Sequence, residues 1–323
     1  MNTSDCRRRW QMVAVIGFAA CVLASGLAPP LPAQGNWPEM RLPTLGGKQF
    51  WTDHLVCGEY RIQQNAITGL FRLLDPHNRK VAGGDFERCR SELRKLQLAD
   101  KVPPPTKTVV LMLHGLGRSR SSMKKLAKAV HDATGWTVMT MEYASTRKPI
   151  NDHVDALDSV LRNLPADTIH LVAHSLGNIV IRRYLKTRTD PKTGVQGDPR
   201  IGRIVMIGPP NQGAALARMF ENIKPFEWIA GKSGLELASD AEAFNRELAI
   251  PKVPFAIIAG SAFASRGGNP LIPGPDDLVV GVAETKLPGA AGFLVVPHTH
   301  TWLMDKKPVQ QATARFLKEG KLR

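Results

Sequence analysis

From residue 108 onward, short apolar runs alternate along the chain with longer stretches of helical spacing. The runs of strand length are Val109–Leu113, Trp136–Tyr143, Thr168–Ala173, Ile201–Ile207, Phe255–Ala259 and Phe293–Val296. The helical stretches are Ser119–Ala133, Asn151–Leu164, Gly177–Thr187 and Val309–Leu317. Strands that are apolar throughout are buried on both faces, and strands joined by helices run parallel. We therefore expect residues 106–323 to form an α/β domain with a mostly parallel central sheet and helices on both faces.

Residues 1–33 have the pattern of an export signal. Arg7, Arg8 and Arg9 precede an apolar run, Met12–Leu27, that ends in small residues and prolines. This run of about 16 residues is shorter than the roughly 20 that a membrane-spanning helix needs. Cleavage of the signal, lipidation at Cys21 and retention as a membrane anchor are all compatible with the pattern. Each of them predicts an exported protein that is periplasmic, extracellular or associated with the cell envelope.

Residues 34–105 are expected to form a small N-terminal extension that ends in a Pro-rich linker, because the three prolines at 103–105 can neither continue a helix nor join a sheet. An extension of this size buries too little apolar area to fold alone, so we expect its helical end, Phe86–Leu98, to pack on the main domain. The extension contains Cys57 and Cys89. Since two thiols in an oxidising compartment usually pair, we predict a Cys57–Cys89 disulfide; the alternative is two separately buried thiols.

The chain carries a formal net charge of +15. Such a charge attracts a protein outside the cytoplasm to anionic membrane or cell-envelope surfaces, and it also suits a solvated surface that resists aggregation. No block of Lys and Arg interleaved with aromatic residues is present in the sequence. We therefore expect no nucleic-acid partner.

The sharpest motif follows the apolar run at 168–173, where Ala173-His174-Ser175-Leu176-Gly177 leads into a helical stretch. A serine in a tight turn between a strand and a helix is held in a strained backbone conformation, and the residues two positions away on either side must be small. Ala173 and Gly177 meet this requirement. We predict that Ser175 is a nucleophile.

A serine hydroxyl is a weak nucleophile until a base takes its proton, so Ser175 requires a histidine and a carboxylate that orients the histidine. In this architecture the acid follows a late strand and the histidine follows the last one. Asp276 and Asp277 lie in a Gly/Pro-rich loop, and His298 and His300 follow the last apolar run. Position alone leaves both members of each pair open.

The run Val109–Leu113 ends in a His-Gly turn at His114 and Gly115. Such a turn can aim a backbone amide at a developing oxyanion. Two donors are needed, and the amides of Leu116 and Leu176 are the natural pair, since Leu176 follows the nucleophile. We interpret His114 as a turn histidine that is bonded to the backbone.

No metal and no cofactor are expected. The nine histidines include no pair at i, i+4 on a helix with a glutamate, and the cysteines are too few for a thiolate cage. The glycines at 115 and 117 lack the third glycine and the downstream ribose-binding acid of a dinucleotide site.

These motifs together resemble the α/β-hydrolase superfamily, and within it the bacterial lipases and esterases with an Ala-His-Ser-x-Gly turn. The matching segments are residues 113–116, 173–177, 209–213, 276–280 and 300–304. Relatives usually have Asn/Ser-Asp-Gly-x-Val in the acid loop, so the resemblance aligns Asp277 with the catalytic acid and puts Leu278 where they have glycine. It aligns His300, and not His298, with the base.

The resemblance implies a hydrolase of ester or lipid substrates that acts through Ser175, Asp277 and His300, and the pattern at 1–33 predicts that it is exported. It also suggests a cap inserted at 216–250, whose apolar residues suit either a lid over an acyl pocket or ordinary helix packing. The alternatives are a thioesterase, an amidase or an acyltransferase on the same scaffold, and a catalytically silent binding protein at the cell envelope.

Overall fold

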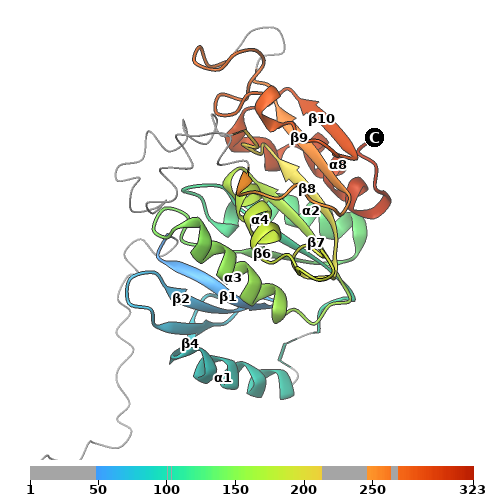
Figure 1. Ribbon diagram of the computed structural model, residues 1–323. Helices are drawn as coiled ribbons and strands as arrows, with labels where there is room; N and C mark the ends of the chain where they lie inside the picture. The colour runs from blue at the N-terminus through green and yellow to red at the C-terminus, as the bar shows by residue number, and fades with distance from the viewer. Residues whose placement is uncertain (1–48, 100, 103, 213–245, 263–267) are drawn as a thin grey trace, which may run out of the picture. The chain divides into compact units, whose positions relative to one another are not determined.

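The computed structural model describes residues 49–99, 101–102, 104–212, 246–262 and 268–323, and its main element is a six-stranded parallel sheet (Figure 1). The strands are β5 (Thr108–Leu113), β6 (Thr137–Met141), β7 (Thr168–His174), β8 (Ile201–Ile207), β9 (Phe255–Gly260) and β10 (Gly292–Val296). Their order across the sheet is β10-β9-β8-β7-β5-β6, and every neighbouring pair is parallel. The predicted α/β fold is confirmed.

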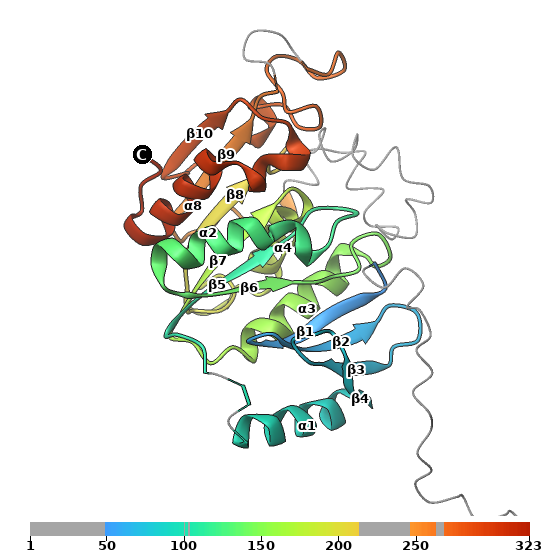
Figure 2. The ribbon, with the colours of Figure 1, turned by 180° about the vertical axis from the view of Figure 1, so that it is seen from behind.

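Helices cover both faces of this sheet, as the opposite views of Figures 1 and 2 show. One face carries α3 (Ile150–Arg162) and α4 (Leu176–Thr187), and the other carries α2 (Lys124–Thr134) and α8 (Lys307–Glu319). Short 3-10 helices lie in the connections: η2 (Arg120–Met123), η3 (Ala283–Thr285) and η4 (His300–Asp305). Alternate residues of β5 enter the two apolar cores, since Leu111 belongs to the core under α3 and α4 and Met112 to the other.

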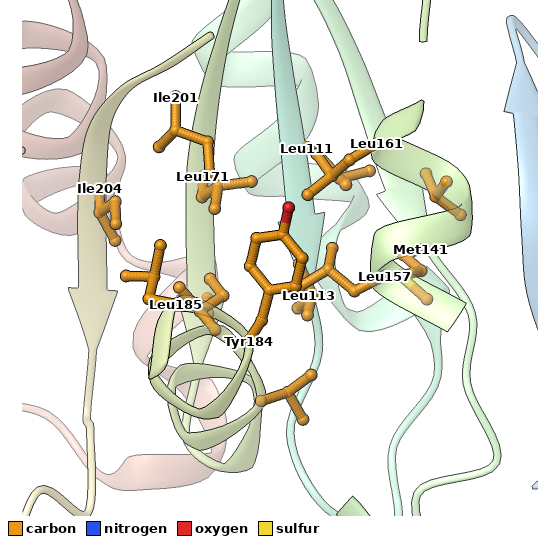
Figure 3. Close-up of a cluster of buried hydrophobic side chains, with 14 of the residues drawn as sticks. Leu111, Leu113, Met141, Leu157, Leu161, Leu171, Tyr184, Leu185, Ile201 and Ile204 are labelled. Atoms are coloured by element: carbon orange, nitrogen blue, oxygen red, sulfur yellow. The ribbon is translucent and has the colours of Figure 1, made fainter. Parts of the chain in front are cut away.

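Tyr184 of α4 lies within the first of these cores (Figure 3). Its labelled neighbours there come from the strands and from α3 and include Leu111, Leu113, Leu157, Leu161 and Leu171. Burying each such side chain contributes about 1.5–3 kcal/mol. The apolar contacts therefore hold α4, whose first residue follows Ser175, firmly against the sheet.

The N-terminal extension forms a second, antiparallel sheet of β1 (Trp51–Cys57), β2 (Tyr60–Asn65), β3 (Phe71–Leu74) and β4 (Lys80–Gly84), followed by α1 (Phe86–Leu98). The Asp85 side chain caps α1 by accepting the Arg88 amide at 2.8 Å. The helix predicted at 86–98 is present, but it packs on β2, β3 and β4 of its own sheet. Instead, β1 contacts α3 and β6 of the main domain.

The predicted Cys57–Cys89 disulfide is not formed in the structure, where both residues are free, buried thiols. Each packs as a small apolar side chain in the core of the extension, beside Leu55, Ile62 and Leu93. Burial raises the pKa of both thiols, and the Gln97 amide donates to Cys57 Sγ at 3.3 Å. Apolar packing therefore holds this core together without a disulfide.

Two sequence predictions lie outside the described residues: the export signal at 1–33, and most of the cap at 216–250, of which only 246–250 is described. Among the described helices, none is long and apolar enough to cross a membrane.

Leu278 has a φ of 82°, in the left-handed region that favours glycine. This is the position at which the related acid loops have glycine. The Leu278 amide donates to Asp276 Oδ1 at 2.8 Å, so the unusual conformation closes a tight turn. Leu278 therefore replaces the glycine of the related loops, but its backbone keeps the conformation that glycine would adopt.

Leu278→Gly should be nearly neutral, within about 1 kcal/mol in the free energy of unfolding, because relief of backbone strain offsets the greater freedom of the unfolded chain. Leu278→Val should destabilise the protein by more, since β-branched residues tolerate positive φ poorly. Urea denaturation of both variants checks the order, and a more stable Val variant would contradict it.

His153 on α3 is fully buried, and burial lowers its pKa to about 3. The unfolded chain, with an ordinary pKa near 6.5, then binds the proton that the folded protein excludes. His153 therefore stabilises the fold above pH 6.5 and loses that contribution as the pH falls toward 3, with a slope of up to about 1.4 kcal/mol per pH unit.

His153→Phe, which keeps a ring against Tyr143, should make stability less dependent on pH between about 6.5 and 4. Chemical denaturation at a series of pH values measures this. The exposed His77→Gln should leave the profile unchanged, and an unchanged profile in His153→Phe would refute the assignment.

Candidate active site

Ser175 lies at the carboxyl edge of the main sheet, where β7 ends at His174 and α4 begins at Leu176. Its backbone has φ 52° and ψ −122°, a conformation that is rare for a residue with a side chain. The Ser175 amide donates to the Ile207 carbonyl at 3.0 Å, which ties the turn to the end of β8. The predicted strand-turn-helix geometry at this serine is therefore present.

Two glycines permit the close approach that this turn needs. A Cβ at Gly177 would lie 2.9 Å from the His114 carbonyl oxygen and from Leu113 Cβ. A Cβ at Gly115 would lie 3.1 Å from Ser175 Cβ and 2.9 Å from His174 Nδ1. Any larger residue at either position would push the serine turn and the His-Gly turn apart.

The structure brings Asp277 and His300 together, with His300 Nδ1 2.7 Å from Asp277 Oδ2. Both side chains are buried, and the His300 amide also donates to the Asp277 carbonyl at 2.9 Å. The other carboxylate oxygen of Asp277 accepts the Val280 amide at 2.7 Å. Hydrogen bonds to both carboxylate oxygens therefore fix the Asp277 side chain, and Asp277 in turn fixes the orientation of the His300 imidazole.

The neighbouring residues Asp276 and His298 have different surroundings. The buried carboxylate of Asp276 accepts backbone amides of Gly268, Asn269 and Leu278. These bonds make it the anchor of its own loop. His298 lies in the loop after β10, where its amide donates to the Val296 carbonyl at 2.8 Å. Of the two aspartates and the two histidines, Asp277 and His300 therefore bond to each other, whereas Asp276 and His298 are bonded within their own loops.

His174 connects the serine turn to His300. Its Nε2 lies 3.0 Å from the His300 carbonyl oxygen, and the two ring centroids are 4.7 Å apart. Burial lowers the pKa of His174 well below its ordinary value, so the neutral ring donates this bond. In the sequence, His174 stands out only as part of the serine motif, and its place next to Ser175 is the one signal for this role.

His300 Nε2 is buried and has no hydrogen-bond partner among the described residues, Ser175 included. Because Nδ1 is bonded to Asp277, Nε2 is the ring atom left to exchange a proton. Bonds between a nucleophile and its base are often long without substrate and shorten when substrate binds.

The turn at His114–Arg118, which we call the oxyanion turn after its predicted role, is held by its own histidine and by Tyr143. His114 Nδ1 lies 2.8 Å from the Gly115 carbonyl oxygen, and the His114 ring stacks on Tyr143 with centroids 4.2 Å apart. The Tyr143 hydroxyl donates to the His114 carbonyl. His114 is thus bonded to backbone within the turn, whereas no sequence signal pointed to Tyr143.

The two predicted oxyanion donors follow the ends of adjacent strands, Leu116 after β5 and Leu176 after β7. The Leu116 amide donates to no described residue. Leu176 is the first residue of α4, where amides have no partner within the helix and the helix dipole is positive. Both amides are therefore available to an anionic oxygen. The described residues contain no cluster of three or more His, Cys, Asp or Glu side chains that could hold a metal.

A comparison with protein families identifies the family of this chain. Residues 110–319 match a family model described as the alpha/beta hydrolase family. No curated protein matches the chain.

A search of solved structures finds, among others, three proteins with some similarity to this chain. A lipase-esterase related protein from Clostridium acetobutylicum is 11% identical, covers 66% of this chain and 94% of its own, and has a TM-score of 0.40. A thermophilic esterase from Thermogutta terrifontis is 14% identical, covers 67% of this chain and 91% of its own, and has a TM-score of 0.42. A bromoperoxidase from Bacillus anthracis is 16% identical, covers 67% of this chain and 94% of its own, and has a TM-score of 0.44. Similarity at these levels carries no inference about substrate.

The family model spans the parallel sheet, the serine turn and the Asp277–His300 pair. This chain belongs to the α/β-hydrolase family.

Proposed function

We propose that this protein is an exported serine hydrolase that cleaves carboxylic esters through an acyl-enzyme intermediate. The observation that carries the proposal is the buried bond between His300 Nδ1 and Asp277 Oδ2, at the same sheet edge as the strained Ser175 turn. A carboxylate that orients an imidazole, a serine held on a tight turn and two nearby amides are the parts that acyl transfer requires.

In the proposed reaction, Ser175 Oγ attacks the ester carbonyl while His300 Nε2 takes its proton. Asp277 stabilises the imidazolium, and the amides of Leu116 and Leu176 donate to the oxyanion of the tetrahedral intermediate. The intermediate expels the alcohol, which receives the proton from His300. Water, activated by the same imidazole, then hydrolyses the acyl-enzyme and frees Ser175.

The proposal of export is supported by the basic residues and apolar run within 1–33, and the net charge of +15 fits a location near an anionic envelope surface. A panel of esters, thioesters and amides separates an esterase from a thioesterase or an amidase on this scaffold. Activation by a lipid interface would identify a lipase within the ester-cleaving class.

Ser175→Ala should lower turnover of a short p-nitrophenyl ester by about 10⁴-fold or more, because the nucleophile is lost. Labelling by a fluorophosphonate probe should vanish as well. The exposed Ser121→Ala is the matched control and should keep both properties. Circular dichroism checks that the variant is folded, and full activity in folded Ser175→Ala would end the proposal.

Asp277→Asn should lower turnover by about 10⁴-fold, since the imidazole loses the partner that fixes its tautomer. Asp276→Asn should lower turnover much less and should mainly reduce thermal stability, because Asp276 accepts loop amides. Steady-state kinetics and melting curves of the two variants test the contrast. The reverse order in turnover would show that the acid is Asp276.

A further inference from the structure

The start of β1 is bonded to the segment that follows β6. The Asp53 amide donates to the Glu142 carbonyl at 2.9 Å, and the Asp53 carboxylate accepts the Glu142 amide at 2.7 Å. One residue earlier, Thr52 Oγ1 accepts the Ala144 amide at 3.2 Å. The N-terminal extension therefore holds residues 142–144 by both its main chain and its side chains.

This attachment includes a buried ion pair. Asp53 is fully buried, with Arg61 Nη1 2.6 Å and Gln63 Nε2 2.8 Å from its carboxylate oxygens. The same Arg61 nitrogen donates to the Thr140 carbonyl of β6 at 2.8 Å. Breaking such a buried pair leaves an uncompensated charge, so Asp53 fixes the Arg61 side chain, and the bond from Arg61 to Thr140 then favours one position of the extension on β6.

Gln49, just ahead of β1, bridges two turns of the main domain with one side-chain amide. Its Nε2 donates to the Arg118 carbonyl in the oxyanion turn. Its Oε1 accepts the Thr146 hydroxyl at 2.8 Å and the Ser145 hydroxyl at 3.3 Å. Ser145 Oγ in turn accepts the Gly117 amide at 3.0 Å.

These bonds hold the chain on either side of Leu116, whose amide is the proposed oxyanion donor. The Gly117 amide on one side and the Arg118 carbonyl beyond it are both held, directly or through Ser145, by Gln49. On the other side, the His114 carbonyl is held by Tyr143. An oxyanion donor stabilises the transition state only when it is already in place, and a shift of about 1 Å can cost about 10²-fold in rate.

We propose that Gln49 is a positioning residue for the oxyanion turn, and that the N-terminal extension thereby completes the active site. Gln49 acts through the Leu116 amide and does not touch the substrate. The inference rests on the proposed function, since it assigns a role to the extension within that same reaction.

Gln49→Ala in the full chain should lower kcat for a p-nitrophenyl ester by about 10- to 100-fold, less than the 10² to 10³ that losing a donor outright costs. KM should change by less than about threefold. The inhibition constant of an aryl trifluoromethyl ketone should rise in parallel with the loss in kcat. This probe adds Ser175 Oγ to its carbonyl carbon, the carbonyl electron pair becomes the oxyanion and the serine proton goes to His300.

The ratio of the ketone's inhibition constant to KM distinguishes positioning from general support of the fold. A merely structural role would lower the melting temperature and leave that ratio unchanged in the folded fraction. The matched control is Gln64→Ala on β2, a glutamine whose side chain donates to the Gly69 carbonyl in its own hairpin. It should leave kcat, KM and the ratio within about twofold of the wild type.

Should Gln49→Ala fail to fold, Ser145→Ala tests the same bridge, because it removes the acceptor of the Gly117 amide. It should lower kcat and weaken ketone binding in the same way. A kcat within twofold of wild type in either folded variant would overturn this inference. Loss of activity in Ser175→Ala alongside that result would leave the proposed function standing, whereas full activity in Ser175→Ala would remove both.

Discussion

The parallel hydrogen bonding of the main sheet is the constraint on which the rest of the site depends. All six strands run in one direction, so their carboxyl ends meet at one edge. The oxyanion turn follows β5, Ser175 follows β7, Asp277 follows β9 and His300 follows β10. These groups come from widely separated parts of the chain, and the parallel strands that carry them are what bring them together.

Close backbone approach sets the spacing of these groups at that edge. A Cβ at Gly260, the last residue of β9, would lie 2.7 Å from Asp277 Cβ and 2.6 Å from the His298 carbonyl oxygen. Gly115 and Gly177 have the same role at the serine turn. The geometry of the site is therefore set by the main chain of these glycines packed closely against neighbouring main chain and buried side-chain atoms, which leaves little room for movement.

The N-terminal extension is joined to the main domain by polar as well as apolar contacts, since its Val56 lies in the core under α3 and α4. Its own core is a separate cluster around Ile62 and Leu93. The polar contacts with β6, the residues after it and the oxyanion turn come from Arg61, which donates to the Thr140 carbonyl, from Asp53, which binds the Glu142 backbone, and from the Gln49 amide. Apolar surfaces can slide over one another at small cost, whereas a buried ion pair with directed hydrogen bonds defines one register. A polar attachment suits a segment that must hold a turn in one position.

The sequence by itself determined the parallel α/β fold and the strand-turn-helix around Ser175, because the period of apolar residues and the small neighbours of a tight turn are local properties. Through the family resemblance it also pointed to Asp277 and His300, but only the tertiary structure showed the bond between them, left Cys57 and Cys89 as free thiols, and linked His174 to His300. It alone placed Gln49 beside the oxyanion turn. These outcomes depend on distances between residues far apart in the chain, and such distances are decided when the strands and loops pack together.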